Sequence, residues 1–272
     1  MHNRISIHGM CLMGSDFQQL PELWQQLQAK RVCLLGQQIE QEGISAARQA
    51  LDSGNWQLEN IVDPFFMGKP LSPEESSWSA PREKINTLID AAGELQANSI
   101  YMTTGGHANG LLWEESAQIF SNAISPCAER ARATGISLML ENAPFHNADI
   151  HIAHSLRDAI TLAEMANLDI CIDLFGCWYE ADLKNLINRA MPRCQLVQIS
   201  DYVFGDRAPA ARAVPGDGGI PLERLLDQVL TAGYQGAFDL ELFGPRIEQE
   251  GRLQAVQRAA DRLGEILHRL GA

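Results

Sequence analysis

Ser137-Leu-Met-Leu-Glu141 is a short apolar run that ends in a carboxylate, and this pattern recurs through the second half of the chain. It returns in Ile170-Cys-Ile-Asp173 and in Ala237-Phe-Asp-Leu-Glu241, and a similar apolar run, Leu196-Val-Gln-Ile-Ser200, carries the amide of Gln198 in place of a carboxylate. Each run has the length of a strand and the nearly continuous apolar character of a strand buried on both faces. A longer amphipathic stretch follows each run, and repeated strand–helix pairs predict a parallel sheet.

The same alternation extends to both ends of the chain. We expect strands at about 5–8, 31–35, 57–62, 99–103, 136–141, 169–173, 195–200 and 237–241. We expect helices at about 16–29, 44–53, 81–96, 113–134, 154–167, 180–190, 221–232 and in a closing segment that ends near 270. Eight pairs within 272 residues predict an α/β fold, a (β/α)₈ TIM barrel, as a single domain over 1–272. No G-x-G-x-x-G motif follows the first strand, so the dinucleotide-binding sheet has no support.

Composition narrows the classes of partner and compartment. A net charge of −13 repels phosphate backbones, so we expect no nucleic-acid and no membrane partner, and a small-molecule substrate instead. The six cysteines form no C-x-x-C pair, which predicts a reduced protein in the cytoplasm. The N-terminus has no apolar signal core, and no run has the length of a membrane span.

The ends of the last four expected strands carry oxygen-donor side chains, namely Glu141, Asp173, Gln198 and Glu241. In a barrel these ends meet at one face, where active sites are built. An apolar strand that ends in a carboxylate buries a charge, and a divalent cation compensates several such charges at once. Oxygen ligands favour one Mn²⁺ or Mg²⁺ ion, with Co²⁺ or Zn²⁺ as alternatives.

Each of these residues also has a purely structural interpretation. An acidic residue after a strand is commonly a helix N-cap, which is open for Asp173, whereas Glu is a poor N-cap. Gln198 is equally compatible with a hydrogen-bonded core amide. Four such coincidences on consecutive strands favour a shared metal site.

At these residues the chain resembles the xylose isomerase-like barrel superfamily, which includes sugar isomerases and epimerases, hydroxypyruvate isomerase, inosose dehydratase and endonuclease IV. The resemblance implies that Glu141, Asp173, Gln198 and Glu241, at intervals of 32, 25 and 43 residues, hold the metal. The stretch from Arg212 to Gly219 resembles the family's Arg followed by Pro-Gly-x-Gly, where the Arg faces metal or substrate. The resemblance also implies a homo-oligomer, a dimer or tetramer.

Two positions depart from the family pattern. Gln198 stands where a His is usual, although hydroxypyruvate isomerases carry Gln there. Asp173-Leu-Phe-Gly176 lacks the His of the frequent Asp-x-x-His motif, which usually contacts substrate. The aromatic residues Phe175, Trp178 and Trp113 are compatible with a less sugar-like rim or with ordinary packing.

These observations predict a metal-dependent isomerase or epimerase of carbohydrate metabolism that acts on a small hydroxy-carbonyl compound through an enediolate. Glu141 and Glu241 are the expected proton-transfer residues. The expected substrate-binding residues are His8, His107, Trp178 and Arg212. The same proton abstraction followed by loss of a β-leaving group would make a dehydratase or another lyase. A non-catalytic carbohydrate-binding barrel is a further alternative, whereas seven histidines and the acidic charge argue against repair of abasic DNA.

Overall fold

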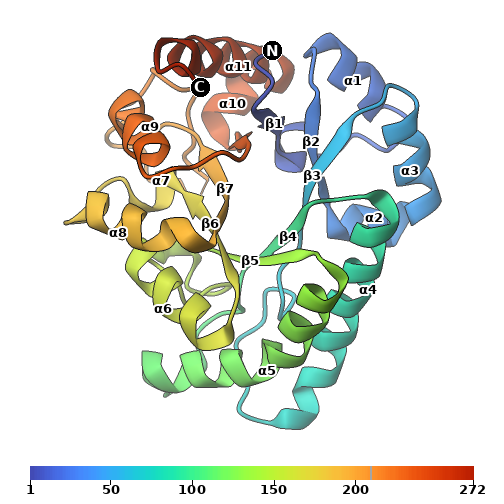
Figure 1. The fold of residues 1–272 in the computed structure, drawn as a ribbon, viewed down its shortest axis with the longest axis vertical. Coiled ribbons are helices and arrows are strands. Elements are labelled where there is room, and N and C mark those ends of the chain that lie inside the picture. Colours follow the sequence, from blue (N-terminus) through green and yellow to red (C-terminus); the bar gives the residue numbers. More distant parts are fainter. Residues whose placement is uncertain (209) are drawn as a thin grey trace. The chain divides into compact units, whose positions relative to one another are not determined.

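A computed structural model describes residues 1–208 and 210–272. Eight parallel strands follow one another in the order of a closed barrel, as the alternation of apolar runs predicts (Figure 1). The strands are β1 (Ile5–Ile7), β2 (Arg31–Leu35), β3 (Gln57–Val62), β4 (Ser99–Met102), β5 (Ser137–Glu141), β6 (Asp169–Asp173), β7 (Cys194–Ile199) and β8 (Phe238–Leu240).

Helices connect the strands. They are α1 (Leu20–Gln26), α2 (Gly36–Glu42), α3 (Ile44–Asp52), α4 (Ser79–Leu95), α5 (Trp113–Thr134), α6 (Leu156–Ala166), α7 (Leu174–Cys177), α8 (Leu183–Ala190), α9 (Leu222–Thr231), α10 (Pro245–Glu250) and α11 (Arg252–Arg269). Short 3₁₀ turns include η1 (Gly9–Leu12) and η3 (Phe145–Asn147). Among the described residues, no helix combines the length and the apolar character needed to traverse a bilayer.

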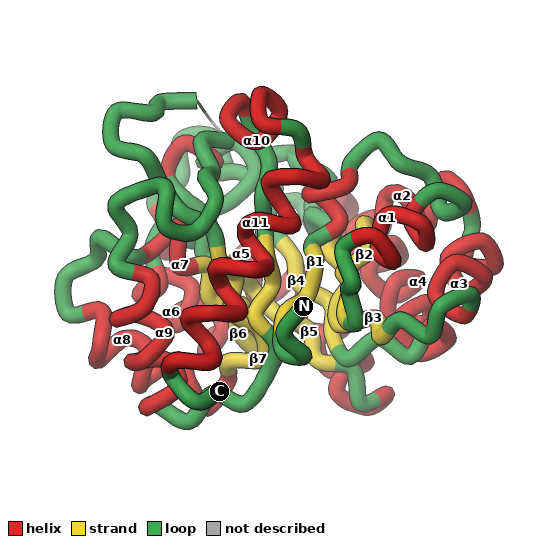
Figure 2. The backbone as a smooth tube through the Cα atoms, turned by 90° about the horizontal axis from the view of Figure 1, so that it is seen from above, coloured by secondary structure: helices red, strands yellow, loops and turns green. Residues whose placement is uncertain are grey.

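The chain divides into two compact units, and the first comprises Met1–Glu59 and Leu196–Ala272. In this unit β1 pairs with both β2 and β8, and β7 pairs with β8. Helix α11 packs on β1, β8 and η1, burying its Ala and Leu side chains against them. The connection from β7 to α9 has neither helix nor strand along its described residues and is drawn as loop in Figure 2.

The second unit comprises Asn60–Gln195. Here β4 pairs with β3 and β5, and β5 pairs with β6, which places four neighbouring strands in register. Helix α5 packs against both α4 and α6 (Figure 1). Its buried face is made of small and apolar residues such as Ala117, Phe120, Ile124 and Cys127.

The helices differ from the expected ones most clearly in the connections after β1, β2, β6 and β8, where α7 precedes α8 after β6 and the closing segment forms both α10 and α11. The stretch expected as a helix over 16–29 becomes helical only at Leu20, because the Asp16 side chain accepts the backbone N–H groups of Gln18 and Gln19 in a turn. The segment after β2 forms two helices, with Gly43 at a φ of 90° between them. Such a φ is readily adopted only by glycine and ends α2.

The six cysteines are free and buried. Their positions in apolar segments let them pack as small hydrophobic side chains.

Candidate functional site

In the second unit, Glu141 and Asp173 are the last residues of β5 and β6. The register pairs Glu141 with Cys171, and Asp173 lies two residues beyond Cys171 on the same strand face. The two carboxylates therefore belong to adjacent strand ends and face the same side of the sheet. Glu141 is 6% exposed and Asp173 is fully buried.

Asn142 ties these two strand ends together. Its Nδ2 donates to the carbonyl of Asp173 at 2.9 Å, and its Oδ1 accepts the backbone N–H of Asp173 at 3.0 Å. The side chain thus replaces a ladder hydrogen-bond pair at the point where β5 ends. Asp173 Oδ1 accepts the N–H of Phe175 at 3.0 Å, so the N-cap interpretation of Asp173 holds for this oxygen.

Gly176 stands where the family motif would place a His, and the local packing explains why this position carries no side chain. A Cβ atom at Gly176 would lie 2.7 Å from Nδ2 and 2.9 Å from the backbone oxygen of Asn142. A histidine at position 176 would therefore displace the residue that joins the β5 and β6 ends. The absence of this His is part of the architecture of this chain.

In the first unit, Gln198 lies on β7 and Glu241 directly follows β8. Gln198 pairs in register with Asp239, and the backbone N–H of Glu241 continues the ladder to the carbonyl of Ile199 at 3.2 Å. Gln198 is fully buried, and Glu241 is 6% exposed. Each unit thus carries two oxygen-donor side chains at the C-terminal ends of adjacent strands.

Arg212 forms an ion pair with Glu241, with 2.5 Å between Nη2 and Oε2. Its Nη1 donates to Ser200 Oγ at 3.0 Å, and the guanidinium lies 5.3 Å from the ring centroid of Phe243. Burial raises the pKa of Glu241, and the positive charge of Arg212 opposes that rise. Arg212 thus neutralises a buried carboxylate from the loop between β7 and α9.

His8 faces the other oxygen of Glu241, with Nε2 4.0 Å from Oε1. Burial lowers the pKa of His8 to about 3, with a further contribution from the charge of Arg212, so the ring is neutral. Nδ1 accepts the N–H of Met10 at 3.1 Å, which assigns the proton to Nε2. His8 therefore presents a hydrogen-bond donor towards Glu241.

His8 also lies within 4.8 Å of Cys33 and Asp239, an arrangement that resembles a metal-binding triad. Burial raises the pKa values of both the Cys33 thiol and the Asp239 carboxyl well above their usual range. A cation here would need a thiolate and an imidazole lone pair. The lone pair of His8 is already occupied by Met10, so the hydrogen bonding favours a packed neutral cluster over a second metal site.

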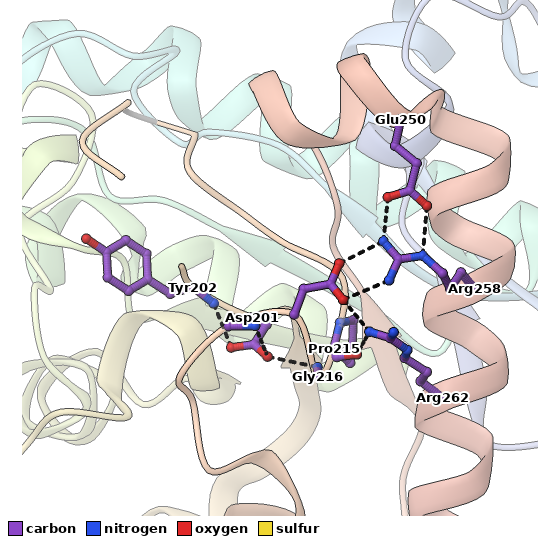
Figure 3. A network of polar contacts seen from close by, with 9 residues as sticks. Asp201, Tyr202, Pro215, Gly216, Glu250, Arg258 and Arg262 are labelled. Carbon is purple, nitrogen blue, oxygen red and sulfur yellow. Dashed lines mark hydrogen bonds and ion pairs between the residues drawn. The ribbon is translucent and has the colours of Figure 1, made fainter. Parts of the chain in front are cut away.

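Asp201 holds the loop that carries Arg212. Its carboxylate accepts the N–H groups of Tyr202 and Gly216 at 2.8 Å (Figure 3). It also accepts those of Gly218 and Ile220 at 3.0 Å. Backbone hydrogen bonds of 2.8 Å also join Asp201 and Ala213 in both directions. Asp201 thus holds the loop against the end of β7.

Helix α11 fixes the same loop from outside (Figure 3). Arg258 reaches both oxygens of Asp217 at 2.8 and 2.7 Å and also pairs with Glu250, and Arg262 contacts Asp217 and the carbonyl of Pro215. The hydrogen bond from Arg258, followed by that from Arg262, lowers the pKa of Asp217. These pairs connect α10, α11 and the loop.

The remaining predicted substrate-binding residues lie in the second unit. His107, which is partly exposed, stacks on His154 with 5.5 Å between ring centroids. Trp178 is partly exposed and packs edge-on against Tyr179, directly after α7. Both follow C-terminal strand ends of this unit, and their contact with a substrate stays a prediction.

Three residues next to the candidate ligands were not predicted from the sequence to have a functional role: Cys11, Asn142 and Asp201. Asn142 directly follows β5 and Asp201 lies two residues after the end of β7, so their position was a usable signal. Cys11 lies in a turn after β1, and nothing in the sequence indicates which backbone groups its thiol meets.

Comparison with known families decides the classification. The sequence profile of the xylose isomerase-like TIM barrel family matches residues 13–266. The chain belongs to this family. A curated relative, "Putative hydroxypyruvate isomerase" of Streptomyces coelicolor, is 25% identical over 217 residues, which cover 74% of this chain and 75% of that protein.

Solved members of the xylose isomerase-like family share the fold over nearly the whole chain. The IOLI protein with a bound zinc atom superposes with a TM-score of 0.80 at 13% identity, covering 98% of this chain and 99% of that one. D-psicose 3-epimerase from Clostridium cellulolyticum H10, crystallised with D-tagatose, superposes with a TM-score of 0.78 at 14% identity, covering 96% and 98%. At these identities the likeness establishes the barrel fold alone.

Proposed function

We propose that this xylose isomerase-like barrel is a divalent-metal-dependent isomerase or epimerase of a small hydroxy-carbonyl compound. The observation that carries the proposal is the burial of four oxygen-donor side chains at the C-terminal ends of consecutive strands. Glu141, Asp173, Gln198 and Glu241 are each at most 6% exposed. Arg212 supplies one positive charge, to Glu241, and a divalent cation would supply the charge that a set of three buried carboxylates requires; oxygen donors suit Mn²⁺ or Mg²⁺.

The local contacts fit this ligand set. Asn142 fixes the backbone of Asp173, and Arg212 and His8 flank the carboxylate of Glu241. Such contacts orient ligands before a cation binds. A bound divalent cation would supply Lewis-acid stabilisation of the negative charge that develops on the substrate oxygens.

The protein's own part in the reaction is proton transfer. One of Glu141 and Glu241 would remove the proton next to the substrate carbonyl, and the other would return it to the neighbouring carbon or to the opposite face, through an enediolate. Arg212 and the Nε2–H of His8 would hold Glu241 in position or bind a substrate oxygen. His107 and Trp178 are the further residues that we propose for substrate binding.

The relatives support this class of reaction. A protein named as a putative hydroxypyruvate isomerase is 25% identical to this chain over an alignment that covers 75% of that protein. An epimerase and a zinc-binding protein share its fold. We therefore propose a hydroxy-keto acid or a short keto-sugar as the substrate and a divalent metal as the cofactor.

A dehydratase or another lyase remains the second candidate, because a specific observation favours it. The strand-six His that usually contacts a sugar is replaced by Gly176, and the packing of Asn142 excludes a side chain there. Loss of a β-leaving group needs the same first proton abstraction but fewer contacts to sugar hydroxyls.

Proton exchange tests both candidates. The Mn²⁺- or Mg²⁺-loaded protein would be incubated in deuterated water with hydroxypyruvate and with short ketoses, and the products followed by NMR. We expect deuterium at the carbon next to the carbonyl, together with an isomerised product. An enone product would assign the lyase reaction instead.

Matched variants show whether the named carboxylates do the chemistry. Glu141→Gln and Glu241→Gln should each lower the exchange rate by about 10²–10⁴-fold, since proton transfer by a side chain contributes that much. Glu164→Gln, which removes a surface partner of Arg189, should retain the wild-type rate. If folded, metal-loaded protein catalyses neither exchange nor elimination with any of these compounds, the proposed function is wrong.

A further inference from the structure

The end of β8 carries Glu241, and the hydrogen-bond ladder between β8 and β1 is incomplete there. The register pairs Ile7 of β1 with Leu240, so His8 lies opposite Glu241. In a parallel ladder, a residue bonds to the two neighbours of its partner. His8 should therefore donate its N–H to the carbonyl of Leu240 and accept the N–H of Leu242 at its own carbonyl.

Only the first of these two bonds has its usual form. His8 N–H donates to the Leu240 carbonyl at 3.1 Å, but the carbonyl of His8 accepts the N–H of Cys11 at 3.0 Å as the chain turns into η1. The N–H of Leu242 points instead to Cys11 Sγ, at 3.3 Å. The N–H of Cys11 thus occupies the His8 carbonyl that would otherwise accept from Leu242. The Cys11 sulfur accepts the N–H of Leu242 instead.

The same thiol also reaches the other side of Glu241. Cys11 Sγ–H donates to the carbonyl of Leu240 at 3.0 Å. The peptide groups before and after Glu241 are therefore both hydrogen-bonded to one sulfur atom. Cys11, Leu240 and Leu242 are fully buried, so no water can replace these bonds.

The thiol keeps the proton that this arrangement needs. Burial raises the pKa of Cys11 far above its usual value, and the nearby carboxyl groups of Asp239 and Glu241 raise it further. A protonated sulfur can donate to one peptide group and accept from the other at the same time.

We propose that Cys11 is a positioning residue for Glu241, whose thiol fixes the two flanking peptide groups and thereby the direction of the carboxylate. The inference rests on the proposed function, in which Glu241 is a metal ligand and a proton-transfer group. Contacts of this kind behind a metal ligand typically change metal affinity by about 10–100-fold when removed.

The test compares Cys11→Ala with Cys11→Ser in the full-length protein. Cys11→Ala removes both hydrogen bonds and should weaken Mn²⁺ binding, measured by calorimetry, by about tenfold or more. It should lower kcat with little change in KM, and the Leu242 amide should exchange faster with deuterated solvent. Cys11→Ser keeps a donor and an acceptor and should restore Mn²⁺ affinity to within a few-fold of wild type.

Cys127→Ala is the matched control. Cys127 is equally buried, and its Sγ lies 3.6 Å from the backbone carbonyl of Arg82, on the outer helix α5. This variant should match wild type in Mn²⁺ affinity and kcat, and thermal unfolding would show that all three variants are folded.

The outcomes separate this inference from the proposed function. If wild-type protein binds Mn²⁺ and Cys11→Ala binds it equally well, the positioning role is wrong while the metal site stands. If Cys11→Ser is as impaired as Cys11→Ala, the packing of sulfur rather than its hydrogen bonding is required, and the inference is again overturned. If wild-type protein itself binds no divalent cation, the proposed function fails and the role of Cys11 in it fails too.

Discussion

At the scale of single residues, the candidate ligands depend on neighbours that do not themselves bind anything. Asn142 is the clearest case, because its side-chain oxygen and its side-chain nitrogen are both hydrogen-bonded to the backbone of Asp173. Its amide cannot be exchanged for a carboxylate without loss, since one contact needs a donor and the other an acceptor.

Asn142→Ala should therefore lower both stability and metal affinity. It leaves the buried carbonyl and N–H of Asp173 without these partners, which destabilises the fold by about 1–3 kcal/mol. Chemical denaturation measures the loss of stability, and calorimetric titration with Mn²⁺ measures the affinity. Asn122→Ala on the exposed face of α5 is the control, and equal effects of the two substitutions would contradict the role of Asn142.

His151 is a second residue whose state is set by its surroundings. Its Nδ1 accepts the N–H of Thr104 at 3.0 Å, so Nε2 carries the proton and donates to the carbonyl of Glu141 at 2.8 Å. Burial lowers the pKa of His151 from 6.5 to about 3. The folded ring therefore stays neutral at pH values where an unfolded one is charged.

This difference predicts a pH-dependent stability. Below pH 6.5 the unfolded state binds a proton that folded His151 does not, so the contribution of His151 is complete above that pH and declines towards pH 3. The limiting slope is about 1.4 kcal/mol per pH unit. We expect the stability difference between wild type and His151→Gln, measured by denaturation, to shrink as the pH falls from 7 to 4. A constant difference would show that His151 does not titrate in this way.

At the scale of elements, the loop after β7 behaves as a braced structure although it has no regular secondary structure along its described residues. Asp201 accepts four backbone N–H groups of the loop. Two arginines of α11, Arg258 and Arg262, hold Asp217 (Figure 3). Because these contacts fix the loop, they also fix Arg212, which lies on it and forms the ion pair with Glu241.

Asp201→Asn should loosen the loop. The amide replaces one acceptor oxygen with a donor that faces N–H groups, and bonds to a buried charged acceptor are worth about 1.5–3 kcal/mol each. We expect lower stability by about 2 kcal/mol or more and faster amide exchange in peptides covering 211–220. Asp206→Asn, which breaks a contact with Arg246 on the same loop, should change neither. Similar exchange in both variants would contradict the role of Asp201.

At the scale of the whole molecule, a cation that binds only the folded barrel must stabilise it. A ligand at about 100 times its Kd adds roughly 2.7 kcal/mol to the free energy of unfolding. We expect Mn²⁺ or Mg²⁺ to raise the Tm of chelator-treated protein, and Glu141→Gln and Glu241→Gln to abolish most of that rise. A Tm that is independent of every divalent metal would contradict a structural dependence on the cation.

The barrel and its family could be predicted because strand and helix periods differ and because eight apolar runs alternate with amphipathic ones. Helix boundaries were less predictable, as the late start of α1 and the break at Gly43 show. The span of one domain over 1–272, a small-molecule substrate, the homo-oligomer and the roles of His8, His107, Trp178 and Arg212 stay predictions.

The sequence by itself determined the order of the eight strands, the main helix after each strand and the oxygen-donor residues at the ends of β5 to β8, because local periodicity and chain order can be read from it directly. Only the tertiary structure decided which groups meet across long sequence separations. It joined Cys11 to Leu240 and Leu242, Asn142 to Asp173, and Arg212 to Glu241. The physical reason is that hydrogen bonds and ion pairs depend on distances and angles, which are fixed only when the strands have paired and their neighbours have packed against them.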